Sequence, residues 1–150
     1  MPSPLRARCE EILGDVLGLL SSTYGIDCDL SCEELLGYLS GPTYEKDAIG
    51  AEEALSDELL LLHEVAETCI LKSMGYRIGR DTVVESRQHT YSAHLRAMDI
   101  ELSEALKRKN PKHIRRRCKD LNSYLYDPYL PSNLVDKVHE LIFKYCWFHT

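Results

Sequence analysis

Histidine and glutamate side chains recur at helical spacing in two stretches of the chain. His63 and Glu67 are four residues apart, and His94 and Glu101 are seven apart. Each pair therefore lies on one face of any helix that contains it. Neutral imidazole nitrogens and carboxylate oxygens are ligands for divalent zinc, iron, manganese or nickel. We therefore take His63, Glu67, His94 and Glu101 as candidate ligands of a divalent metal.

A metal ion bound by these residues could support hydrolytic chemistry. The ion would lower the pKa of a bound water, and Glu64 is the candidate catalytic base beside it. The His-Glu-x-x-His signature of zinc proteases is absent because position 67 is glutamate, and the chain has no Glu-x-x-His motif of the di-iron bundles.

The alternative to a metal is an ordinary set of buried pairs. His63 and His94 flank the apolar stripes of their helices, where a histidine often bonds to a nearby carboxylate. His63 with Glu67, or His94 with Glu101, would satisfy each other in this way. The sequence favours this paired state over an occupied metal site.

The elements that carry these residues are all predicted to be helices. Apolar residues recur at helical spacing, capping signals are frequent, and strand-like alternation is rare. We expect an all-α single domain of about six helices, and 150 residues are enough to bury a continuous core. The expected helices cover residues 4–23, 31–41, 51–74, 82–109, 110–124 and 132–146.

The third and fourth of these helices should form a long antiparallel hairpin over residues 51–109. With a turn near residue 78, residues at the same height have numbers that sum to roughly 157. His63 is then level with His94. The hairpin is thus expected to bring the two histidines together.

A basic segment follows the hairpin. Residues 107–119 contain eight lysines and arginines and no acidic residue, although the whole chain has a net charge of −6. Such a segment could bind RNA phosphates or an acidic protein, and it could equally be a solvated face that complements a helix dipole. The candidate anion-binding or nucleic-acid-binding residues are Lys112, Arg115, Arg116, Arg117 and Lys119.

The six cysteines are scattered, and the N-terminal stretch does not resemble a signal peptide. We therefore expect free, reduced thiols and a cytoplasmic protein. No apolar run approaches the roughly 20 residues of a membrane span, so no membrane partner is expected. The aromatic residues Trp147 and Phe148 should pack against the core.

Three functions remain open at this stage. The leading one is a helical binding or adaptor module that self-associates, as a homodimer or other homo-oligomer, because no catalytic constellation matches a strict pattern. The second is the metal-dependent hydrolase. The third is an RNA-binding or RNA-cleaving domain that uses the segment 107–119.

Overall fold

The computed structural model describes residues 3–42 and 50–146. Within these ranges every regular element is helical, so the all-α class is confirmed. The elements are α1 Pro4–Tyr24, α2 Cys32–Ser40, α3 Ala51–Leu55, α4 Glu58–Ser73, α5 Thr82–Glu85, α6 Arg87–Lys107, α7 Pro111–Tyr124, the 3-10 turn η1 Ser132–Leu134, and α8 Val135–Tyr145.

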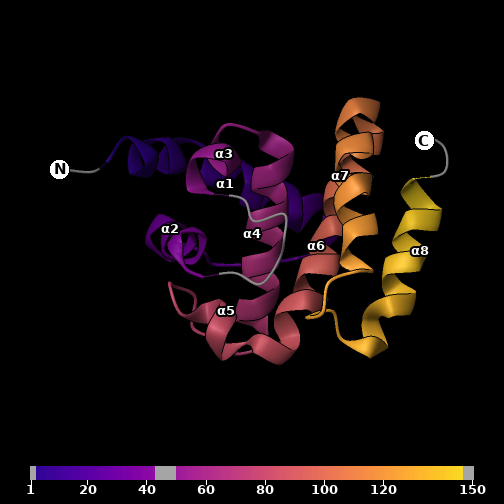
Figure 1. The fold of residues 1–150 in the computed structure, drawn as a ribbon. Helices are drawn as coiled ribbons and strands as arrows, with labels where there is room; N and C mark the ends of the chain where they lie inside the picture. The colour runs from indigo at the N-terminus through magenta and orange to yellow at the C-terminus, as the bar shows by residue number, and fades with distance from the viewer. Residues whose placement is uncertain (1–2, 43–49, 147–150) are drawn as a thin grey trace.

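Helix α4 is the central element of the fold. It packs against α1, α2 and α3 and, most extensively, against α6, whereas α7 and α8 cover another side of α6 (Figure 1). Every residue from 59 to 71 is buried, so α4 has no solvent face along most of its length. A helix that is buried all round is normally apolar all round, but α4 also buries His63, Glu64 and Glu67. Burial of these groups needs compensation from neighbouring helices.

Helices α4 and α6 pack against each other, but the two long continuous helices of the predicted hairpin are not present as such, because each is interrupted. The first is divided into α3 and α4 at Ser56 and Asp57, and the second into α5 and α6 at Ser86. Asp57 explains the first break, because its carboxylate accepts hydrogen bonds from the amides of Leu59 and Leu60 and so begins a new helix. The second break falls at Ser86, which the sequence placed inside one helix.

Helix ends elsewhere follow their sequence signals. Ser31 and Glu34 form the expected capping box at the start of α2. Gly25 ends α1 with a φ of 68°, a left-handed conformation that glycine adopts without a steric penalty. Asn110 caps α7 by accepting a hydrogen bond from the amide of His113. These local signals fix where the helices stop and therefore where the chain can turn.

The expectation of free thiols is wrong, because all six cysteines are paired. The Cα atoms of each pair are 5.7 to 5.9 Å apart, within the usual range for disulfides. The partners are 23 to 41 residues apart in sequence, so only the packing of the helices brings them together. The bonds are Cys9–Cys32, Cys28–Cys69 and Cys118–Cys146.

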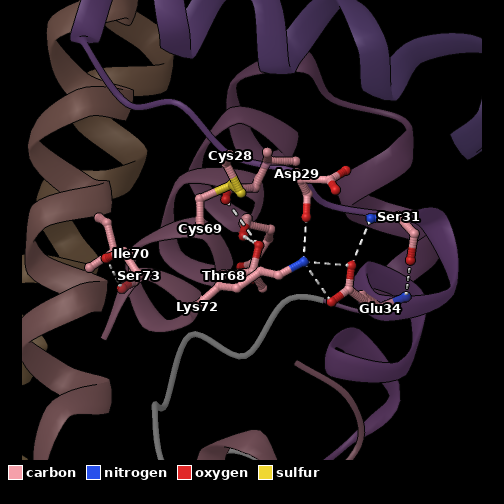
Figure 2. Close-up of a disulfide and its surroundings, with 11 residues drawn as sticks. Cys28, Asp29, Ser31, Glu34, Thr68, Cys69, Ile70, Lys72 and Ser73 are labelled. Carbon is pink, nitrogen blue, oxygen red and sulfur yellow. Dashed lines mark hydrogen bonds and ion pairs between the residues drawn. A yellow bond between two sulfur atoms is a disulfide. The ribbon is translucent and has the colours of Figure 1, made fainter. Parts of the chain in front are cut away.

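Each disulfide fastens a peripheral segment. The first joins α1 to α2, the second joins the α1–α2 loop to α4, and the third joins α7 to the end of α8. Figure 2 shows Lys72 near the second disulfide. Its ammonium group donates to the carbonyl of Asp29 and contacts the carboxylate of Glu34. The N-terminal helices are thus held against α4 by covalent and ionic contacts.

Two sequence expectations concern other parts of the chain. None of the helices in the described ranges is long and apolar enough to cross a membrane. Trp147 and Phe148 lie outside the described residues.

Candidate metal centre

The interface of α4 and α6 brings three potential ligand atoms together. Nε2 of His63 lies 3.1 Å from Nδ1 of His94 and 3.3 Å from Oε1 of Glu67. The third side of the triangle, from His94 Nδ1 to the same glutamate oxygen, is 2.7 Å long. All three residues are buried, with residue exposures of 0% for His63, 3% for Glu67 and 4% for His94. Two ring nitrogens and one carboxylate oxygen therefore converge on a single buried point.

The other nitrogen of His63 faces a second buried carboxylate. Nδ1 of His63 lies 2.8 Å from Oε1 of Glu101, the distance of a charge-assisted contact. The second oxygen of Glu101 contacts His113 Nε2 at 2.5 Å and Arg117 Nε at 2.8 Å. Glu101 thus joins His63 to α7. A carboxylate beside Nδ1 favours a proton on that nitrogen, which leaves Nε2 with its lone pair directed into the triangle.

Tyrosine hydroxyls hold the other two members of the triangle. Tyr38 of α2 donates a hydrogen bond to Oε2 of Glu67. Tyr124 of α7 lies 2.7 Å from Nε2 of His94, on the opposite side of the ring from the triangle. Each potential ligand atom therefore belongs to a side chain whose other polar atom is fixed by a different helix. This arrangement is typical of metal-binding histidines and carboxylates, whose outer partners set the tautomer and orientation.

The charges of this cluster favour a cation in the triangle. If the imidazoles are neutral, the carboxylates of Glu67 and Glu101 face one guanidinium, Arg117, and these groups carry one excess negative charge. Burial by itself would lower the pKa of His63, but the carboxylates of Glu101 and Glu67 more than offset it and raise that pKa well above 6.5. The cluster therefore stabilises a positive charge beside His63, whether a proton or a metal ion supplies it.

The pKa values of the two carboxylates are lowered, in contrast to that of His63. Burial would raise the pKa of Glu67, but its contacts with His63 and His94 hold that pKa far below the usual range. For Glu101, burial is likewise outweighed by Arg117, His113 and His63, so its pKa is also far below the usual range. Both side chains are ionised in the folded protein.

The sequence-based ligand set is brought together in part. His63, Glu67 and His94 form the triangle, and the contact between His63 and His94 agrees with the equal height expected for these two residues. Glu101 lies on the far side of the His63 ring, so it contacts the non-triangle nitrogen. Glu64, the predicted base, is 7% exposed on α4 and is close enough to His63 to raise its pKa electrostatically.

The residues that complete the cluster escaped the sequence analysis. Tyr38, His113 and Tyr124 come from α2 and α7, which lie outside the predicted hairpin. One signal was present: His113 and Tyr124 are eleven residues apart, three helical turns, and so share a face of one predicted helix. No comparable spacing links Tyr38 to the hairpin.

The basic segment is divided by the structure. Arg117 is 1% exposed and lies between Glu101 and Asp120, so its charge serves the core. Arg116 is exposed and pairs with Glu53 of α3 at 2.9 Å. The remaining members of the predicted anion-binding set are exposed on α7 and have no ion pair with any described residue: Lys112, Arg115 and Lys119.

No protein-family model, curated protein or solved structure matches the chain.

Proposed function

We propose that the protein binds one divalent metal ion, Zn²⁺, through His63 Nε2, His94 Nδ1 and Glu67 Oε1. The observation that carries this proposal is the convergence of these three atoms, with sides of 2.7, 3.1 and 3.3 Å, at a buried point. Ligands bound 2.0–2.1 Å from a tetrahedral zinc ion are about 3.3 Å from one another. To accept the ion, the shortest side of the triangle, 2.7 Å, therefore needs to lengthen by about 0.6 Å, and the other two sides need little or no change.

Zinc fits this donor set better than the alternatives that helical proteins use. Two imidazoles and one carboxylate are a common zinc set, and they lack the all-oxygen coordination that magnesium and calcium prefer. All six cysteines are in disulfides, so thiolates do not compete for the ion. The ion would supply the positive charge that the carboxylates of Glu67 and Glu101 require.

The test is the metal content of the purified, disulfide-bonded protein. We expect one zinc per chain after exposure to zinc and removal of the excess, and a higher melting temperature with zinc than with a chelator. Glu67→Gln and His94→Gln should each remove the bound zinc, whereas His139→Ala, on an exposed position of α8, should retain it. Circular dichroism establishes that each variant is folded. If the folded wild-type chain retains no zinc and its melting temperature does not respond to zinc, the proposal is wrong.

Zinc-dependent hydrolysis is a second candidate function. Three protein ligands leave a fourth tetrahedral position for water, which is the pattern of hydrolytic zinc sites, and Glu64 is a carboxylate near it. The burial of all three ligands favours a structural role, because a substrate would have to enter through movement of the surrounding helices. Zinc-dependent cleavage of a model ester that is lost in Glu64→Gln, with zinc retained, would support hydrolysis.

The three disulfides bear on the compartment. The cytoplasmic location was expected from the scattered cysteines and from an N-terminal stretch unlike a signal peptide, whereas structural disulfides persist in oxidising compartments. We infer that the protein works in an oxidising environment. Alkylation of the protein in cell extracts, before and after reduction, distinguishes a cytoplasmic from an oxidising location. Rapid labelling of all cysteines without reduction would support the cytoplasm.

A binding or adaptor role rests on exposed surface groups. Phe143 on α8 is 75% exposed, and Tyr126 and Tyr129 between α7 and α8 are 82% and 64% exposed, which offers apolar surface for self-association. Among the candidate anion-binding residues, Lys112, Arg115 and Lys119 are exposed without an ion pair to a described residue and are open to RNA or an acidic protein. A mass in solution that increases with concentration supports self-association, and affinity for RNA that falls steeply with salt supports the RNA partner.

A further inference from the structure

A pocket lies between α1 and the turn that joins α3 to α4, on a different side of α4 from the metal centre. Its volume is about 360 Å³, within the range of small-molecule sites. Its floor is fully buried: Leu55, Leu61 and Leu62 are 3%, 2% and 1% exposed. Its other wall is α1. The apolar lining consists of Ile12, Val16, Leu19, Leu55, Leu61 and Leu62.

The shape and lining of the pocket favour a flexible aliphatic ligand. All six apolar lining residues are aliphatic, so no aromatic ring offers a stacking surface. The lining residues of α1 run from Arg8 to Leu19, which is about 16 Å along the helix axis at 1.5 Å per residue. A chain of methylene groups laid along this face would bury its surface against leucine, isoleucine and valine side chains.

One cation at the pocket is available for a ligand. Arg108 is already neutralised, because its Nε contacts Glu104 at 2.9 Å and its Nη1 contacts Glu58 at 2.6 Å. Arg8 is different: its one contact with the described residues is a long hydrogen bond, 3.4 Å, from Nε to the carbonyl of Leu55. The two terminal amino groups of Arg8 therefore have no carboxylate partner in the described part of the chain. A planar guanidinium with free donors is suited to a carboxylate.

The acidic groups limit the ligand to one negative charge. Asp57 is occupied as the cap of α4. Asp15 lies seven residues after Arg8 on the same face of α1, about 10 Å along the axis, and is exposed. A second carboxylate at the far end of a ligand would approach Asp15 and be repelled.

We propose that this pocket binds an aliphatic monocarboxylate, with the carboxylate on Arg8 and the hydrocarbon chain between α1 and the start of α4. The inference is independent of the proposed zinc site, since none of its residues belongs to the metal cluster.

The probe is sodium decanoate, titrated calorimetrically into the disulfide-bonded protein at concentrations up to about 1 mM, in the range of weak specific binding. Decanol, decylamine and decanedioate serve as ligands with other head groups. We expect saturable one-to-one binding of decanoate, about tenfold weaker binding of decanol, and still weaker binding of decylamine and decanedioate.

Variants locate the site. Arg8→Gln should lower the affinity for decanoate to that of decanol and leave decanol binding unchanged. Val16→Trp should fill the pocket and abolish both. Arg6→Gln is the matched control, because Arg6 is an exposed arginine of α1 that does not line the pocket, and it should change neither affinity.

Several results would overturn the proposal. These are the absence of saturable decanoate binding, tighter binding of decylamine than of decanoate, an unchanged decanoate affinity in Arg8→Gln, or binding that survives in a folded Val16→Trp protein. The zinc content of each variant is measured in parallel, so a failure here is distinct from a failure of the metal site.

Discussion

Nε2 of His63 and Nδ1 of His94 lie 3.1 Å apart in the core, although 31 residues separate them in the sequence. Two ring nitrogens at this distance cannot both present lone pairs to each other, so one of them carries a hydrogen atom unless a metal ion lies between them. In the metal-free protein a hydrogen atom within the triangle fulfils this role. In the proposed holo protein zinc fulfils it.

Replacing Glu101 with glutamine should weaken both folding and zinc binding. The change removes one of the carboxylates that neutralise the buried Arg117, and loss of one partner from a buried ion pair costs about 3–5 kcal/mol of unfolding free energy. It also removes the carboxylate that fixes the tautomer of His63, for which a 10- to 100-fold loss of zinc affinity is expected. Urea unfolding and zinc titration measure the two effects.

The matched control for this experiment is Asp120→Asn. Asp120 also contacts Arg117, at 2.8 Å, but it is partly exposed and this ion pair does not involve His63. We expect a smaller loss of stability and unchanged zinc affinity. Equal zinc affinities for Glu101→Gln and the wild type would contradict the orienting role of Glu101.

Removal of the Tyr38 hydroxyl should act through Glu67. Tyr38→Phe deletes a hydrogen bond to an ionised, buried carboxylate, and such bonds contribute about 1.5–3 kcal/mol. We expect a loss of stability in that range and a zinc affinity reduced by about tenfold. Tyr91→Phe is the control, because the Tyr91 hydroxyl bonds to Asp127 at 2.7 Å and the change keeps the ring that packs against His94. If both variants bind zinc equally well, α2 does not orient the site.

The stability of the zinc-free protein should be greatest in mildly acidic solution. The raised pKa of His63 means that its protonation stabilises the fold below 6.5, the ordinary histidine value, and that this contribution is lost as the pH rises through the folded value. The lowered pKa values of Glu67 and Glu101 give stability above the ordinary value of 4.5 that is lost as the pH falls through their folded values. The melting temperature should therefore peak between about pH 4.5 and pH 6.5.

Zinc should reverse the alkaline part of this profile. Because the ion replaces a proton in the triangle, zinc binding should release protons and strengthen as the pH rises. Calorimetric titrations in two buffers with different ionisation enthalpies measure the released protons directly. A binding enthalpy that is independent of the buffer, or a metal-free protein whose stability increases steadily from neutral to alkaline pH, would count against proton–metal competition.

The disulfide between α7 and α8 should contribute strongly to stability. Replacing both Cys118 and Cys146 with serine opens a loop of 28 residues, and the chain-entropy estimate for such a loop is about 3–4 kcal/mol. Urea unfolding under non-reducing conditions measures this loss, and the retained zinc content reports whether α7 still orients the site.

The wild-type chain should resist alkylation after denaturation unless it is first reduced. Ready alkylation without reduction would show that the cysteines are not paired.

Most of the secondary structure could be predicted from the sequence because its signals are local. Capping residues such as Ser31 and Asn110, the terminal Gly25 and the apolar spacing act within a few residues, so they identify helices before any packing is known. The hairpin added one long-range result, the meeting of His63 with His94, because a short connection forces two helices to run side by side. It missed the breaks at Asp57 and Ser86. The Asp57 carboxylate bonds to the backbone amide of Leu59 and begins a new helix, and the Ser86 hydroxyl bonds to the hydroxyl of Thr90.

The sequence by itself therefore determined the all-helical class and the pairing of His63 with His94. Tertiary packing decided the rest of the site. Glu101 lies beside the outer nitrogen of His63, and α7 brings Arg117 and His113 against the Glu101 carboxylate. The spacing of residues within one helix does not predict how a neighbouring helix is rotated about its axis. The cysteine pairs depend in the same way on tertiary packing, because each bond joins cysteines that are 23 to 41 residues apart in different segments of the chain.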